Sequence, residues 1–286
     1  MSNLAEKLVE NSIEKNGYNN DLEATLDCVK KITKNNINIL VYKSNLEATK
    51  DVAKKIAGLM NRKKTDGLNQ TANIGLATGK SPLMVYKELV RMHKEEGLDF
   101  RDTKLFNLDE FWPVHESDPR SHHSEMYNNL YKHVNINPNY VFIPKGSGFS
   151  RILVQQYCDN YEKEINYSGG LDIQLLGIGP NGHIAFNEPG SSEASPTRFV
   201  KLSDATLKQK SVDWGSVEKT PKYSITMGIQ TIMNANEIAL LAFGKDKASV
   251  VSKAVNCIPN REFPASLLQK HGNVYFYVDE AAASEI

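Results

Sequence analysis

The sequence predicts an α/β fold: a single domain built on a doubly wound, mainly parallel sheet with helices on both faces. Three observations predict it. Short apolar runs alternate with amphipathic stretches from residue 37 onward. No internal repeat, low-complexity tract or long linker interrupts the 286 residues. Hydrophobic residues make up 40% and charged residues 24%, which is the balance of a chain that buries one sizeable core.

The first 36 residues are predicted to form an N-terminal helical extension. Two short amphipathic patterns, at 3–16 and 21–34, are separated by the helix-breaking run 17–20. We therefore divide the chain into an extension at 1–36 and a main domain at 37–286. The role of the extension stays open.

Strands and helices alternate after the extension. Seven apolar runs have the length and the flanking turn residues of buried strands. They lie at 37–42, 73–77, 104–108, 140–143, 171–178, 237–243 and 274–278. Amphipathic helical patterns lie between them, at 45–62, 83–96, 124–133, 150–166 and 245–255. Because the apolar runs show no polar face, helices are predicted to cover both sides of the sheet.

Charge and cysteine content argue against several classes of function. Lys plus Arg equals Asp plus Glu at 34 each, so the chain lacks the basic surplus that holds nucleic acid. A small anionic partner needs only a few local donors. The three cysteines form no C-x-x-C pair, which fits a reducing compartment. With neither a signal-peptide core nor an apolar run long enough to span a membrane, we expect a cytoplasmic protein without a membrane partner.

Ligands of open parallel sheets bind at the carboxyl ends of the strands, which directs attention to the loops after residues 77, 108 and 178. The first loop, 78–82, has the sequence TGKSP and runs directly into a helical pattern. Glycine, hydroxyl groups and a helix N-terminus together suit an anion. The glycine spacing does not fit a nucleotide P-loop. A plain helix cap with a tight turn is the alternative.

The second loop begins with the carboxylate pair Asp109 and Glu110, flanked by Phe106, Phe111 and Trp112. A carboxylate between apolar walls at the end of a strand is a plausible general base. The alternative is that the pair caps a helix or lies in a solvated turn, which is the commoner fate of Asp-Glu.

The third loop is the most informative, and it reads GIGPNGHIAFNEP over 177–189. It brings His183 and Glu188 close together after a buried strand. A histidine with a carboxylate close behind it is typical of an oriented proton shuttle. The three glycines have the spacing of a dinucleotide-binding fingerprint, but the run enters a loop where that motif needs a helix.

A cluster of histidines and acidic residues at 115–123 invites a metal interpretation. It contains His115, Glu116, Asp118, His122 and His123. These residues lack the i, i+4 helical spacing of a zinc pair and lie in a loop that contains proline. We therefore expect no metal at this cluster.

These motifs together resemble the glucosamine-6-phosphate deaminase/isomerase family over roughly residues 37–286. The resemblance rests on LATGKSP (76–82), FNLDEF (106–111), SHHSEMYNNLYKHV (121–134), LGIGPNGHIAFNEPGSS (176–192) and TPKYSITMGIQTIMNANEI (220–238). The related 6-phosphogluconolactonases have a different run after the histidine, without the glutamate. The presence of Glu188 therefore favours the deaminase.

The resemblance implies a role for each matching residue. The residues that would cradle the sugar phosphate are Thr78, Gly79, Lys80, Ser81 and Lys222. Asp109 would move a proton between C2 and C1, His183 would assist ring opening, and Glu188 would be its carboxylate partner. The implied reaction converts glucosamine 6-phosphate into fructose 6-phosphate and ammonia, without a cofactor. A homo-oligomer is also implied.

Two departures from the family concern the site. Many members have Asp where this chain has Asn181, which can still orient the imidazole but supplies no charge, so we expect a less basic His183. The family's second phosphate-binding arginine falls near 207–215, where this chain has Lys208 and Lys210 instead. A third departure is the long chain start, so activation by an effector cannot be assumed.

Three rival functions stay open. One is the same chemistry on another hexosamine phosphate, such as the galactosamine epimer. A second is 6-phosphogluconolactonase activity, which Glu188 and the FNLDEF segment disfavour. The third is a non-catalytic sugar-phosphate sensor, which the intact Asp109, His183 and Glu188 disfavour.

Overall fold

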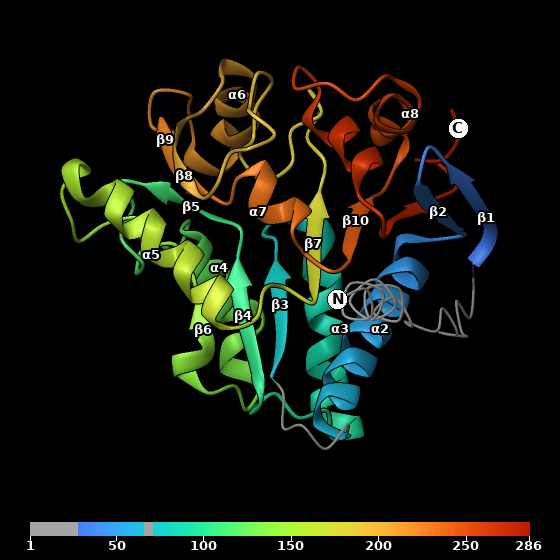
Figure 1. Cartoon of the computed structure of the whole chain (residues 1–286), viewed down its shortest axis with the longest axis horizontal. Coiled ribbons are helices and arrows are strands. Elements are labelled where there is room, and N and C mark those ends of the chain that lie inside the picture. The colour runs from blue at the N-terminus through green and yellow to red at the C-terminus, as the bar shows by residue number, and fades with distance from the viewer. Residues whose placement is uncertain (1–27, 66–70) are drawn as a thin grey trace, which may run out of the picture.

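The computed structural model describes residues 28–65 and 71–286. Its main sheet has eight strands in the order β1-β2-β11-β10-β7-β3-β4-β6 (Figure 1). The seven strands predicted from the sequence are β2 (Ile37–Tyr42), β3 (Ala72–Leu76), β4 (Thr103–Asn107), β6 (Val141–Phe142), β7 (Ile173–Gly177), β10 (Ile238–Ala242) and β11 (Val274–Asp279). All seven pair in parallel. The predicted doubly wound fold is confirmed.

The first strand corrects the helix that was predicted over 21–34. Its described part is β1 (Cys28–Lys34), which pairs antiparallel with β2. Asn35 and Asn36 both have positive φ, 48° and 62°, and form the tight turn that joins the two strands. A local amphipathic pattern is a weak signal, and pairing with β2 overrides it. The helix predicted over 3–16 lies outside the described residues, and the division of the chain into an extension at 1–36 and a main domain at 37–286 stays a prediction.

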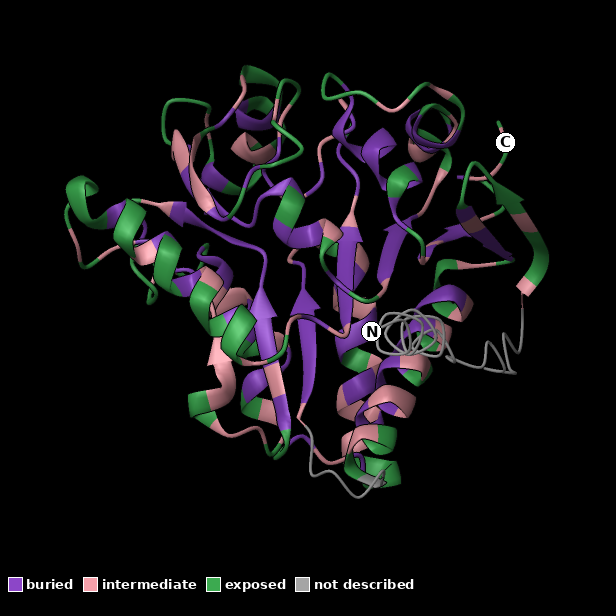
Figure 2. Cartoon of the chain, viewed as in Figure 1, coloured by how far each residue is buried: buried purple, intermediate pink, exposed green. Residues whose placement is uncertain are grey.

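Helices cover the main sheet on both faces, and each face has its own apolar cluster. One cluster receives side chains from α2 (Asn45–Thr65), α3 (Lys80–Glu96) and α4 (His122–Asn129). The other receives side chains from α5 (Val154–Tyr167), α7 (Ile229–Met233) and α8 (Ala248–Asn256). The inner strands are buried from both sides (Figure 2). Their continuous apolar sequence follows from this arrangement.

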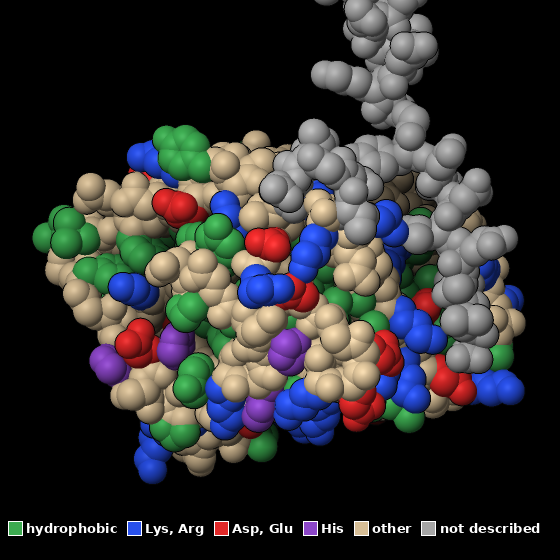
Figure 3. Space-filling model, turned by 90° about the horizontal axis from the view of Figure 1, so that it is seen from below, with side chains coloured by type: hydrophobic (Ala, Val, Ile, Leu, Met, Phe, Trp, Pro, Cys, Tyr) green, Lys and Arg blue, Asp and Glu red, His purple; other side chains and the backbone are tan. Residues whose placement is uncertain are grey.

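The remaining helices are α6 (Asp204–Trp214) and short 3₁₀ turns. The 3₁₀ turns are η2 (Tyr131–His133), η3 (Pro138–Tyr140), η4 (Arg151–Leu153), η5 (Lys245–Lys247) and η6 (Pro264–Lys270). None of the described helices is both long and apolar enough to cross a membrane. On the face drawn in Figure 3, acidic and basic side chains are interspersed.

A second, three-stranded antiparallel sheet stands at the carboxyl end of β4, and the sequence did not predict it. Its order is β5 (Asp109–Trp112), β9 (Tyr223–Thr226) and β8 (Arg198–Lys201). The segment predicted as a loop after residue 108 is therefore a strand. Leu108 connects the two sheets, since its N–H donates to Leu76 O at 2.9 Å and its carbonyl accepts from Met227 N at 2.8 Å.

Candidate active site

The three loops singled out in the sequence meet at one edge of the main sheet. Strands β7, β3 and β4 are neighbours in that order, and their carboxyl ends lie side by side (Figure 1). The loops after them carry residues 78–81, Asp109 and His183. The small second sheet begins at the same edge, with Asp109 as its first residue. A common edge is what the rule for open parallel sheets requires.

The loop after β3 ends in the N-terminus of α3. Gly79 is the N-cap residue, and its φ of 104° is one that only glycine adopts freely. No side chain caps the helix from within the loop, so its first N–H groups are available to an anion. The Gly79 N–H donates to Oε1 of Glu125, a residue of α4, at 2.8 Å. This carboxylate oxygen thus occupies the backbone donor of the residue that precedes the first turn of α3.

The structure separates the two members of the carboxylate pair. Ser121 is the N-cap residue of α4, and Glu110 adds to the cap, because its carboxylate accepts the backbone N–H groups of His122 and His123 at 3.0 and 2.9 Å. Asp109 makes a different contact: its Oδ1 lies 2.8 Å from Nδ1 of His122. Asp109 is buried, with 7% of its side chain exposed. Of the two carboxylates, only Asp109 is left for chemistry.

His122 was predicted only as part of a metal-like cluster, and its place beside Asp109 was missed. Burial lowers its pKa, but the hydrogen bond to Asp109 and the charge of that carboxylate outweigh burial and raise the pKa to about 9. The imidazole is therefore protonated at neutral pH. The remaining members of the cluster are dispersed: Asp118 pairs with Arg120 at 2.7 Å, and His115, Glu116 and His123 border a separate cavity of about 760 Å³.

The loop after β7 forms a hydrogen-bonded chain of three side chains. Oδ1 of Asn181 lies 2.7 Å from Nδ1 of His183, and Nδ2 of Asn181 donates to Oε2 of Glu188 at 2.8 Å. Because a carboxylate can only accept, the amide nitrogen must face Glu188 and the amide oxygen must face the ring. Nδ1 of His183 is therefore the donor, which leaves Nε2 as the lone-pair nitrogen of the neutral ring.

The environment of His183 favours its neutral form. Burial lowers its pKa, and the positive charges of Lys210 and Lys247 act in the same direction, against the charge of Glu188. Close packing holds the ring in place, since a Cβ on Gly179 would lie 2.2 Å from the His183 ring. The pKa values of the two site histidines, His122 and His183, are thus shifted in opposite directions.

Helix α6 borders the site on the side of the second sheet. Thr206 donates to Oε1 of Glu188 at 2.5 Å, a contact that the sequence did not predict. Lys210 lies 5.9 Å from the centroid of the Phe111 ring, and its charge acts on both His122 and His183. Lys208 is exposed. Of the two lysines, Lys210 is the one whose charge reaches the site.

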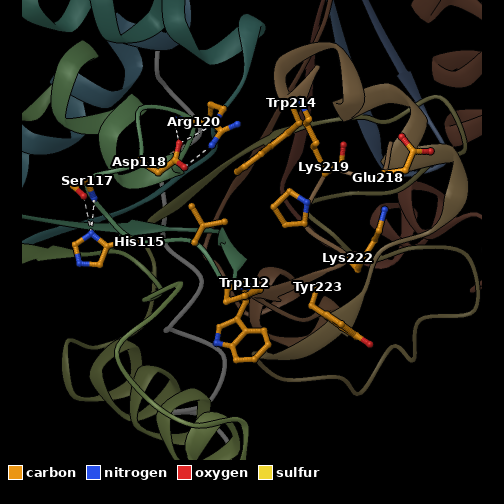
Figure 4. Close-up of a pocket in the computed structure, with 14 residues that line it drawn as sticks. Trp112, His115, Ser117, Asp118, Arg120, Trp214, Glu218, Lys219, Lys222 and Tyr223 are labelled. Atoms are coloured by element: carbon orange, nitrogen blue, oxygen red, sulfur yellow. Dashed lines mark hydrogen bonds and ion pairs between the residues drawn. The ribbon is translucent and has the colours of Figure 1, made fainter. Parts of the chain in front are cut away.

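Lys222 is the one predicted phosphate ligand that the structure does not bring to the loop at 78–81. It directly precedes β9, beside the Trp112–Tyr223 pair, while Asp109 pairs with Thr226 at the other end. Its ammonium donates to the carbonyl of Val217. Lys222 lines a cavity of about 710 Å³ with Arg120 and Trp214 (Figure 4). No contact between described residues joins Lys222 to 78–81.

Comparison with known proteins places this site in a family. A family model described as glucosamine-6-phosphate isomerases/6-phosphogluconolactonase matches residues 44–276. A protein of Clostridium botulinum (strain Langeland) named glucosamine-6-phosphate deaminase is 42% identical over 213 residues, 74% of this chain and 86% of the relative. A protein of Halothermothrix orenii with the same name is 42% identical over 211 residues, with the same coverage.

Solved structures agree in fold. One, described as a monomeric glucosamine-6-phosphate deaminase, has a TM-score of 0.81 at 36% identity and covers 87% of this chain and 99% of its own. A 6-phosphogluconolactonase from Trypanosoma brucei has a TM-score of 0.69 at 21% identity, covering 90% and 100%. At that lower identity the likeness shows the fold alone.

Proposed function

The chain belongs to the family of glucosamine-6-phosphate isomerases and 6-phosphogluconolactonases, and we propose that its site converts glucosamine 6-phosphate and water into fructose 6-phosphate and ammonia. Relatives named glucosamine-6-phosphate deaminase, 42% identical over three quarters of the chain, support this substrate. The observation that carries the chemistry is the placement of Asp109 and the Asn181-bridged His183–Glu188 pair at one sheet edge.

The phosphate of the substrate is assigned to the start of α3. The backbone N–H groups there, the hydroxyls of Thr78 and Ser81 and the ammonium of Lys80 offer donors of the kind that hold an anion. Lys80 is exposed, so its ammonium is free to turn toward a ligand. Lys222 would join them only after leaving the carbonyl of Val217.

His183 is assigned to ring opening. In its neutral form, Nε2 takes the proton of the C1 hydroxyl and delivers it to the ring oxygen as the bond from C1 to that oxygen breaks. The product is the open-chain aldehyde. The hydrogen bond from Nδ1 to Asn181 keeps the ring in the required tautomer, and Glu188 holds Asn181 in turn.

Asp109 is assigned to the isomerisation. Its carboxylate removes the proton from C2 while the substrate's C2 ammonium passes a proton to the C1 oxygen, which gives an enolamine. Asp109 then returns its proton to C1, which gives a protonated ketimine. Addition of water to the ketimine carbon then releases ammonia and leaves fructose 6-phosphate. The substrate's own amine supplies the electron pair that a cofactor would otherwise provide.

Turnover assays test this function directly. Ammonia release and fructose 6-phosphate formation are measured for the wild type, for Asp109→Asn and for wild type treated with a chelator. We expect the wild type to be active with and without the chelator. We expect Asp109→Asn to lose about 10²–10⁴-fold in kcat, the contribution of a general base. An inactive wild type would contradict the proposed function.

Galactosamine 6-phosphate and 6-phosphogluconolactone serve as rival substrates in the same assay. No contact among the described residues of the site favours either. Faster turnover of the galactosamine epimer would reassign the substrate without changing the chemistry. Binding of glucosamine 6-phosphate without turnover would favour the sensor.

Location in the cytoplasm and assembly into a homo-oligomer also stay proposals. The three described cysteines are free thiols, as a reducing compartment favours. One solved relative is described as monomeric, so size measurement by light scattering decides the oligomeric state of this chain. A mass of one chain, 32.0 kDa, would contradict the oligomer.

A further inference from the structure

We infer that His122 is the positioning residue of Asp109: it holds the carboxylate by Oδ1 and leaves Oδ2 as the oxygen that takes the proton from C2. This inference rests on the proposed function. His122 contacts Asp109 and is given no contact with the substrate, so its effect on the reaction passes through Asp109.

The contacts of His122 hold the carboxylate in one orientation. Nδ1 lies 2.8 Å from Oδ1 of Asp109 and 3.0 Å from the backbone oxygen of the same residue. The imidazole thus contacts both the carboxylate and the backbone of the strand that carries it. Within the described residues, no hydrogen bond reaches Oδ2 of Asp109. The free oxygen is the one that can accept a proton from carbon.

The imidazole itself has little freedom to move. It lies between Phe111 and Phe186, with ring centroids 4.9 and 6.0 Å away and the Phe186 ring nearly parallel. Only 3% of the His122 side chain is exposed. Its backbone N–H donates to Glu110, which is also on β5, at 3.0 Å. Helix α4 and strand β5 are therefore joined at the point where the base must be fixed.

The charges around His122 make the contact an ion pair. Asp109 and Glu110 face it from β5, and the ammonium of Lys210 faces it from α6. The third element packed against it, the loop after β7, contributes the apolar ring of Phe186. With two carboxylates against one ammonium, the protonated imidazole is favoured.

The ion pair also bears on the fate of the abstracted proton. Once Asp109 has taken the C2 proton, the buried imidazolium no longer faces a full negative charge. Return of that proton to C1 restores the ion pair between His122 and Asp109. The rings of Phe111 and Phe186 shield the imidazole from water. The pair therefore favours delivery of the proton to carbon over exchange with solvent.

Substitution of His122, with its neighbour His123 as control, tests the inference. His122→Phe keeps the ring packing and removes the donor, and His122→Gln keeps a neutral donor. We expect His122→Phe to lose about 10²-fold in kcat, with a small change in KM. The acid limb of its kcat/KM profile should move to a higher pH. His122→Gln should recover part of the loss. His123→Gln should match the wild type, because His123 faces a different cavity.

Two readouts separate the possible failures. Solvent deuterium content at C1 of the product should rise in His122→Phe, and NMR titration should place the wild-type His122 near pH 9 and lower in Asp109→Asn. The titration does not require turnover, so it keeps its meaning if the proposed function fails. A loss that appears only in KM or thermal stability, with the pH profile and deuterium content unchanged, would overturn the positioning role. So would a His122→Phe variant as active as His123→Gln.

Discussion

At the scale of single residues, one amide side chain sets which nitrogen of the His183 ring carries the proton. Asn181 can satisfy His183 and Glu188 at once only because its two ends differ, one donating and one accepting. An aspartate at this position would have to face the carboxylate of Glu188. It would then add a negative charge beside the imidazole that the present chain lacks.

Replacement of Asn181 by Asp should therefore raise the pKa of His183, since a nearby negative charge favours the protonated ring. Less of the neutral imidazole would be present near pH 7, and kcat/KM should fall there. The measurement is an NMR titration of the ring together with a kinetic pH profile. An Asn181→Asp variant whose His183 is less basic than that of the wild type would contradict the role given to the amide.

A second prediction concerns Glu125. Its carboxylate accepts the Gly79 N–H at the start of α3, where the substrate phosphate is expected, and two anions compete for one donor. Glu125→Gln should lower KM for glucosamine 6-phosphate about fivefold, the effect of removing one repulsive charge pair. The exposed Glu116 gives the control variant Glu116→Gln. An unchanged KM in Glu125→Gln would place the phosphate elsewhere.

At the scale of elements, α6 ties the second sheet to the catalytic loop. Leu207 and Trp214 pack with Phe111 and Phe186 in a small apolar cluster, and Thr206 reaches Glu188. The helix thereby presents Lys210 to the two histidines, while Lys208, two residues earlier, lies on its exposed side.

The two lysines of α6 allow a matched comparison. Lys210→Met should reduce kcat/KM about tenfold or more, because a charge-assisted contact to an anionic substrate contributes about 1.5–3 kcal/mol. Lys208→Met should leave kcat/KM unchanged. Steady-state kinetics of the two variants, alongside their thermal unfolding, decides the point. Equal losses in both would assign the effect to the helix, not to the Lys210 ammonium.

The strands of the two sheets differ in how well the sequence predicts them. The inner strands of the parallel sheet are buried on both faces, so each is a largely apolar run that stands out in the sequence. The edge strand β6 is half-buried, with two apolar residues. Strands β5, β8 and β9 have four residues each, and each of their partners is far away in the chain. DEFW resembles a turn until the pairing with β9 is known. Short strands of this kind take their structure from tertiary contacts.

Sequence patterns also predicted only part of the site. Residues 78–81, Asp109 and His183 could be located because they follow predicted strands that end at a common edge. His122, Thr206 and Glu125 could not, since each reaches the site from a helix and no pattern in the sequence fixes how that helix packs. The role of Lys222 in holding the phosphate stays a prediction, and its ammonium contacts the carbonyl of Val217 in this structure.

At the scale of the whole molecule, the buried ion pair links stability to pH. The pKa of His122 is raised from 6.5 to about 9 on folding. The stabilisation is therefore fully present below about pH 6.5 and is lost as the pH rises through about 9. It amounts to at most about 3 kcal/mol.

Urea unfolding at several pH values measures this contribution. The difference in free energy of unfolding between wild type and His122→Phe should shrink as the pH increases from about 6.5 to 9. The His123→Gln variant should follow the wild type throughout. A difference that stays constant with pH would mean that His122 contributes through packing alone.

The hairpin at the start of the described chain bears on how copies of the molecule can associate. Strand β1 is the outer edge of the eight-stranded sheet, and its backbone would accept a further strand. Three of its seven residues, Lys30, Lys31 and Lys34, are exposed lysines. Two such edges brought together would place like charges side by side and discourage a continuous intermolecular sheet. Any assembly of this chain is thus expected to be built through other faces, and this edge resists aggregation.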